Sequence, residues 1–148
     1  MSAPADPVSA GARTAGLLEE ACRSESADSL RFAVVRDLAL DIERGLDVLV
    51  RSEDAAAPDL LAEAALRCAD LANLAACTTP QLPPDEAPQA LAAARLAAGA
   101  VRDLRPLVEA GSRDLDAEHA GNLIRDVRSA AWRAEFATRL VDESPGGG

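Results

Sequence analysis

Residues 28–51 read DSLRFAVVRDLALDIERGLDVLVR, and their pattern decides the fold class. Apolar side chains recur in this stretch at alternating steps of three and four residues, which places them along one side of an α-helix. The row consists of Val35, Leu38, Ile42 and Leu49, with Gly45 in the one position that lacks a side chain. Further apolar residues beside the row make it wider than the seam of a two-stranded coiled coil. The stretch is therefore predicted to be a helix packed inside a bundle, approached closely by another group at Gly45.

Four other segments carry the same helical spacing and are separated by stretches rich in Pro, Gly or Ser. The predicted helices comprise residues 9–23, 28–51, 58–77, 85–110 and 114–141. Pro58 and Asp59 suit the first turn of the third helix. Pro106 lies inside the fourth, and we expect it to kink or end that helix because proline clashes with the carbonyl four residues earlier.

This succession of helices predicts an all-α fold. The four long helices are joined by short or moderate loops, which favours an antiparallel four-helix bundle with a short additional N-terminal helix as a cover. Residues 9–142 are expected to form a single helical-bundle domain. We expect residues 1–8 to be a flexible N-terminal arm and residues 143–148 to be a flexible tail.

The composition and charge of the chain limit the classes of partner that it is expected to bind. Of its 148 residues, 49% are hydrophobic and 27% are charged, as in one globular domain. The formal net charge of −10 opposes binding to nucleic acid or to anionic lipid, so neither is an expected partner. All basic residues are Arg and Ala is abundant, which indicates a GC-rich bacterial genome. The lack of Lys excludes Schiff-base chemistry and a phosphate-binding lysine.

Several absences point to the cytoplasm. The segment Met1–Pro7 has no basic start followed by an apolar core, as a secretory signal would have. No apolar run approaches the roughly 18 residues that span a bilayer. The three cysteines, Cys22, Cys68 and Cys77, are odd in number and lack the spacing of a metal site, so we expect them to be reduced.

The residue types needed for catalysis or metal binding are scarce. His119 is the single histidine, whereas a di-iron bundle needs Glu-x-x-His on two helices. We expect Cys68 and Cys77 to be small buried residues of the third helix and Cys22 to be exposed. No metal, no cofactor and no catalytic residue is therefore predicted, and the chain is expected to be a non-enzyme rather than an enzyme.

The most distinctive side chains lie on the fifth predicted helix, in a second row offset from its Ala and Leu band. They recur at steps of three and four residues and are Arg125, Arg128, Trp132, Phe136 and Arg139. Aromatic side chains flanked by arginines can anchor a protein partner by stacking and cation–π contact, so these five are the predicted partner-binding residues. The alternative is that Trp132 and Phe136 pack beneath the first helix while the arginine stems cover their edges.

These features predict a non-catalytic helical bundle that acts by protein–protein association. It could be a homo-oligomer such as a dimer, or a regulatory or adaptor partner of another protein. The alternative is a small-molecule-binding or enzymatic bundle that uses Asp or Glu with Arg in a cavity beside Pro106. A third possibility, an acidic mimic of nucleic acid, rests on net charge alone, and arginines interspersed with the carboxylates weigh against it.

Overall fold

The chain folds into five packed α-helices, so the predicted all-α class is confirmed. The computed structural model describes residues 6–23 and 29–142. The helices are α1 (Pro7–Ala21), α2 (Ser29–Arg51), α3 (Pro58–Thr78), α4 (Ala87–Gly111) and α5 (Ala117–Asp142), with single 3₁₀ turns at Thr79–Gln81 and Ser112–Asp114. The predicted tail and most of the predicted arm lie outside the described residues. No described helix is both long enough and apolar enough to cross a membrane.

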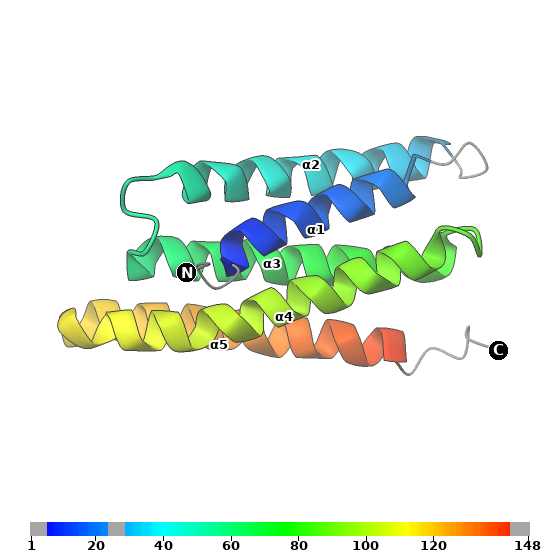
Figure 1. The fold of residues 1–148 in the computed structure, drawn as a ribbon. Helices are drawn as coiled ribbons and strands as arrows, with labels where there is room; N and C mark the ends of the chain where they lie inside the picture. The colour runs from blue at the N-terminus through cyan, green and yellow to red at the C-terminus, as the bar shows by residue number, and fades with distance from the viewer. Residues whose placement is uncertain (1–5, 24–28, 143–148) are drawn as a thin grey trace, which may run out of the picture.

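The helices lie side by side, and successive helices run in opposite directions (Figure 1). The most extensive packing joins α3 to α4. α1 packs against α2 and α4, while α5 packs against α3 and α4. α2 rests on α1 and, over a smaller area, on α3, so that α2 and α5 flank the molecule at opposite edges. One outward side of α5 is therefore left without a neighbouring helix.

The first helix belongs to the interior of the packing. Ala15 and Leu18 of α1 are completely buried. Gly11 faces the fully buried Cys68 of α3, and Gln89 Nε2 of α4 donates a hydrogen bond of 2.8 Å to the carbonyl oxygen of Leu17. α1 thus links α2 to the α3–α4 pair, rather than only covering the other helices.

Local capping explains where two helices begin. Asp6 Oδ1 accepts a hydrogen bond of 3.0 Å from the backbone N–H of Val8, and Pro7 occupies the first turn, so α1 begins two residues before the predicted Ser9. At α5, Asp116 Oδ1 accepts from the backbone N–H of His119 at 2.9 Å. Asp116, and not the predicted Asp114, therefore caps this helix, because residues 112–114 form a 3₁₀ turn.

Pro106 does not end the fourth helix, which continues through it to Gly111. Of the two alternatives, a kink or an end at Pro106, the end is therefore excluded. Proline removes one backbone donor, which leaves the carbonyl of Arg102 without its intrahelical partner. Both Arg102 and Pro106 are exposed, so solvent can satisfy that carbonyl and the helix can tolerate the break.

Two glycines mark close approaches between helices. A Cβ atom on Gly11 would lie 2.6 Å from the Sγ atom of Cys68. A Cβ on Gly45 would clash with the guanidinium group of Arg67, which reaches over from α3. The prediction that another group packs closely against Gly45 is thus confirmed.

Because of these two contacts, we expect a Gly→Ala substitution to change the free energy of unfolding differently at Gly11 and at Gly45. Gly11→Ala and Gly45→Ala both gain about 1 kcal/mol of helix propensity. Cys68 is short and fully buried, whereas the Arg67 side chain is long and partly exposed and can swing aside. We expect Gly11→Ala to be less stable than Gly45→Ala by about 1–3 kcal/mol in denaturant titrations. Equal stability of the two variants would contradict this account of the α1–α3 contact.

Candidate functional site

The five predicted partner-binding residues share the outward side of α5. The opposite side of the helix faces α3 and α4 and buries Leu123, Val127, Ala130, Ala134 and Ala137. Each of the five predicted residues is exposed: Arg125, Arg128, Trp132, Phe136 and Arg139. We call these five residues the aromatic–arginine face. The helical spacing therefore placed them correctly on one side of one helix.

Two aromatic rings form the centre of this face. The Trp132 and Phe136 rings are stacked, with 5.7 Å between their centroids and 10° between their planes. Trp132 is 67% exposed and Phe136 is 48% exposed. The alternative that α1 covers them is wrong, because α1 packs on α2, α3 and α4 instead. Leu140, one turn beyond Phe136 and 43% exposed, extends the apolar row and was missed, although its spacing indicated it.

The arginines of the face are available to a partner. Within the described ranges, the ion pairs are Glu63–Arg67, Arg95–Asp142, Arg105–Glu109, Asp59–His119 and Asp70–Arg133. None of these pairs involves an arginine of the aromatic–arginine face. Three guanidinium groups without a carboxylate partner thus surround an apolar centre.

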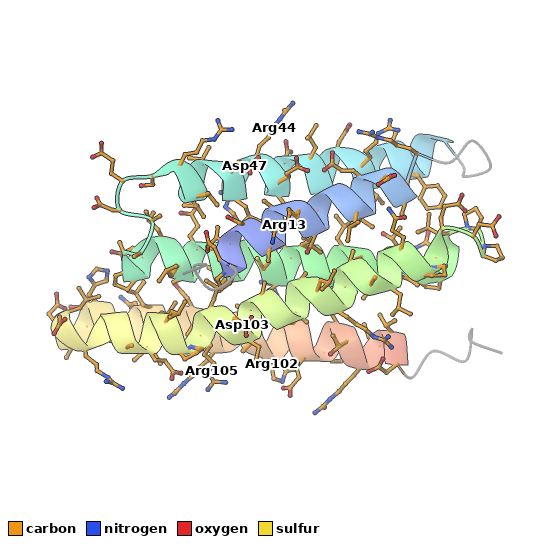
Figure 2. The ribbon with its side chains drawn as sticks, viewed as in Figure 1. Arg13, Arg44, Asp47, Arg102, Asp103 and Arg105 are labelled. Atoms are coloured by element: carbon orange, nitrogen blue, oxygen red, sulfur yellow. The ribbon has the colours of Figure 1, made fainter. Side chains whose placement is uncertain are left out.

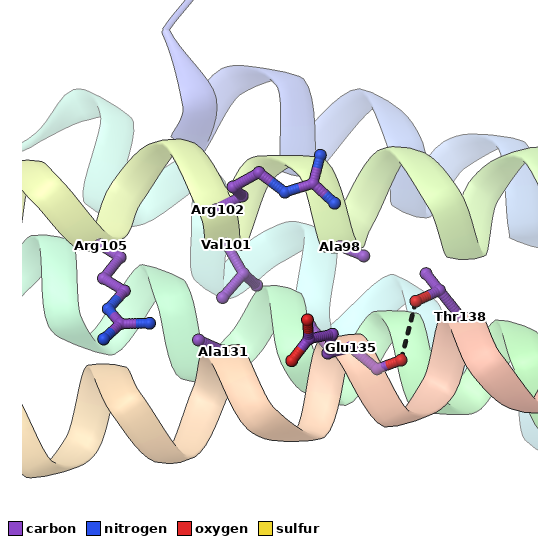
Figure 3. Close-up of a pocket in the computed structure, with 8 residues that line it drawn as sticks. Ala98, Val101, Arg102, Arg105, Ala131, Glu135 and Thr138 are labelled. Carbon is purple, nitrogen blue, oxygen red and sulfur yellow. Dashed lines mark hydrogen bonds between the residues drawn. The ribbon is translucent and has the colours of Figure 1, made fainter.

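A shallow groove between α4 and α5 adjoins this face (Figure 3). Its volume is about 130 Å³, and its lining consists of Ala98, Val101, Arg102, Arg105, Ala131, Ala134, Glu135 and Thr138. Arg105 extends from α4, and the Glu135 carboxylate lies between the two helices. Arg105 Nε also donates to Glu109 Oε1 at 3.0 Å. The groove is therefore small, lined with alanines and bordered by arginines.

A second polar feature, missed by the sequence analysis, lies between α1 and α2. Glu19 is only 6% exposed, its Oε2 atom is buried without a hydrogen-bond partner among the described residues, and the half-buried Glu43 of α2 lies beside it. Burial, and after it the neighbouring Glu43 carboxyl group, raise the pKa of Glu19 to about 7, while the charges of Arg23 and Arg44 oppose the shift. In the sequence, the burial of Glu19 could have been predicted from its position in the apolar row of α1, between Ala15 and Cys22.

The space beside this carboxyl pair is an open hollow of about 270 Å³. Arg13 and Asp47 lie at its rim on α1 and α2, and Glu43 contributes to its wall (Figure 2). In the described part of the chain, no three His, Cys, Asp or Glu side chains come together in a way that could hold a metal ion.

The cysteines correct two expectations. Cys68 is buried as predicted, and burial raises its pKa to about 12, which leaves the thiol unreactive near neutral pH. Cys22, which was expected to be exposed, is buried, with 3% of its surface exposed, because it continues the buried row of α1. Cys77 is exposed instead of buried, because it lies on the side of α3 that no helix covers.

His119 connects the beginnings of α5 and α3. Its Nε2 atom lies 2.5 Å from Asp59 Oδ1, and both side chains are partly exposed. The pair ties two helix ends together and lies apart from the aromatic–arginine face, since His119 is in the first turn of α5.

No protein-family model matches this chain, and no curated protein is similar enough to count as related. The case for its function therefore rests on the geometry described above.

The buried carboxyl pair predicts a pH-dependent stability. In the folded state Glu19 holds its proton up to about pH 7, whereas its ordinary pKa is 4.5. Its stabilising contribution is therefore complete below pH 4.5 and is lost as the pH rises to about 7. We expect Glu19→Gln to exceed the wild type in unfolding free energy by about 2 kcal/mol at pH 8 and by less at pH 5.

The control for this measurement is Glu20→Gln, which changes an exposed carboxylate of the same helix. Its difference from the wild type should stay constant between pH 5 and 8. If Glu19→Gln behaves like Glu20→Gln, the carboxyl pair does not control the stability of the α1–α2 contact.

Proposed function

We propose that this protein acts by protein–protein association, without catalysis, and that the aromatic–arginine face of α5 is its binding surface. The observation that carries the proposal is the stacked Trp132–Phe136 pair, which is exposed at the centre of the face. Trp and Arg are enriched among the residues that dominate binding energy at interfaces. A stacked pair on one helix also loses little conformational freedom on binding, since the two rings already restrict each other.

The energetic argument is the apolar area that a partner would remove from water. A large aromatic side chain presents on the order of 200 Å². With two thirds of Trp132 exposed, its complete burial would contribute about 3 kcal/mol at 25 cal/mol per Å². The flanking arginines would add orientation and selectivity, because their charge favours one arrangement of the partner over others.

The rest of the molecule serves this surface as a rigid support. We regard the framework as an antiparallel four-helix bundle to which the shorter α1 is added, in keeping with the alternating helix directions. We further propose a bacterial cytoplasmic location, which suits the three free cysteines. The association is either that of a homo-oligomer or that of a regulatory or adaptor protein with its target.

A second candidate function, small-molecule binding or catalysis, draws on the groove between α4 and α5. The lining of this groove includes Arg102, Arg105 and Glu135, and Arg105 directly precedes Pro106 in α4. The groove volume of about 130 Å³ is small beside the roughly 300–1,000 Å³ of ordinary small-molecule sites. Protein association is therefore the better-supported proposal.

The test compares Trp132→Ala with Val48→Ala. Val48 is equally exposed, at 68%, but lies on α2 at the opposite edge of the molecule. Both variants should keep the wild-type unfolding temperature, because exposed side chains contribute little to stability. We expect Trp132→Ala alone to weaken association roughly thirtyfold, a loss of about 2 kcal/mol, whether light scattering measures a homo-oligomer or affinity capture measures a partner.

Two results would contradict the proposal. One is equal association of Trp132→Ala, Val48→Ala and the wild type. The other is unfolding of Trp132→Ala, which would mean that the ring supports the fold instead of a partner. Because Trp132 is the single tryptophan, a blue shift of its fluorescence on association reports directly on burial of this face.

A further inference from the structure

We propose that the partner of the aromatic–arginine face is an acidic amphipathic helix of another protein, an inference that rests on the proposed function. Its apolar row would cover Trp132, Phe136 and Leu140. Its carboxylates would lie beside the row and meet Arg125, Arg128 and Arg139. The shape of the face, its charge and its poor fit to a second copy of itself each support this partner.

The shape of the face suits a helix. Trp132, Phe136 and Leu140 are spaced by four residues along α5 and form one continuous exposed row. At 1.5 Å per residue the row extends about 12 Å, which is a little over two helical turns. A partner helix presents anchors at steps of three, four and seven residues over the same length, so its apolar stripe can cover the row from end to end.

The charge of the face selects an acidic partner. The chain as a whole carries a net charge of −10, whereas this face has three arginines and one exposed carboxylate, Glu135, beside it. On the neighbouring α4, the exposed Arg102 and Arg105 border the groove, whose lining includes a single carboxylate, Glu135. An acidic helix meets favourable charges at this face, whereas the negative field of the remaining surface discourages it from binding elsewhere.

A second copy of this chain fits the face poorly. A symmetric contact would bring the same three arginines from each copy, six guanidinium groups in all, into one interface. Among the described residues of α5, the exposed Glu135 lies one turn before Arg139 and is outnumbered by these arginines. Like charges gathered in a desolvated contact are costly, so hetero-association with an acidic segment is favoured over self-association. Nucleic acid offers negative charge too, but its extended backbone would also meet the acidic remainder of the molecule.

The experiment uses the full chain and two designed helical peptides of about 18 residues. Both peptides carry the same row of leucines, which begins with Leu at positions 1, 5 and 8 of the peptide. One has Glu and the other has Lys at the positions flanking that row. Binding is measured by the fluorescence of Trp132, the single tryptophan. We expect the Glu peptide to bind at least about tenfold more tightly than the Lys peptide. The affinity of the Glu peptide should fall several-fold as the salt concentration is raised.

Matched charge reversals separate local from global electrostatics. Arg128→Glu and Arg44→Glu change the net charge equally, but Arg44 extends into solvent from α2 at the opposite edge of the molecule (Figure 2). Arg128→Glu should lower the affinity for the Glu peptide about tenfold or more, whereas Arg44→Glu should change that affinity less than twofold. Thermal unfolding of both variants checks that the fold is retained.

Several outcomes would overturn the inference. These are equal binding of the two peptides, preference for the Lys peptide, no binding of either, and equal effects of the two charge reversals. Tighter binding of a single-stranded oligonucleotide, or a dimer that Trp132→Ala dissociates, would assign the face to a different occupant.

The proposed function fails separately, if Trp132→Ala and Val48→Ala associate alike in the earlier test. Loss of association in Trp132→Ala without a preference for the Glu peptide would leave the surface in place and remove only its acidic partner.

Discussion

The structure depends on the close approach of α3 and α4, which is possible because both helices meet through alanine. On α3, Ala64, Ala65, Ala72 and their neighbours are buried, and on α4 the same holds for Ala93, Ala94 and Ala97. Small side chains let two helix backbones come near each other, so that much of the interior is filled by main chain and Cβ atoms. The remaining helices then pack on the two sides of this pair: α1 on α4 and α5 in the groove between α3 and α4.

An interior of this kind has little room for aromatic rings. Phe32 is buried, but Trp132 and Phe136 stand on the outer side of α5 and stack on each other. Leaving large apolar groups in water sacrifices hydrophobic stabilisation that folding could have gained, and a partner can recover it. Three arginines lie near these rings, and none of them is ion-paired with a carboxylate in residues 6–23 and 29–142, so the surface has a positive charge in a chain of net charge −10.

The α1–α2 contact contrasts with this rigid centre. It contains the buried carboxyl group of Glu19 beside the half-buried Glu43, and a hollow lies next to Glu43. The α3–α4 contact, in contrast, is made largely by alanines. A protonated Glu19 is compatible with burial, whereas an ionised one disfavours it, so the α1–α2 contact responds to pH in a way that the alanine contact does not. This pH-responsive contact is thus separated from the proposed binding surface, which is supported by α3 and α4.

The sequence by itself determined the helices and the residues that share each side of them. All five helices begin and end close to their predicted bounds, and the five residues of the aromatic–arginine face lie on one side of α5. These properties follow from spacing along one helix, which is local. Only the tertiary structure decided which sides are covered: that Cys22 is buried and Cys77 exposed, that Glu19 meets Glu43, and that α1 packs away from Trp132. Periodicity states which residues lie together, but burial depends on where a helix distant in sequence comes to rest, and that is set by packing among all five.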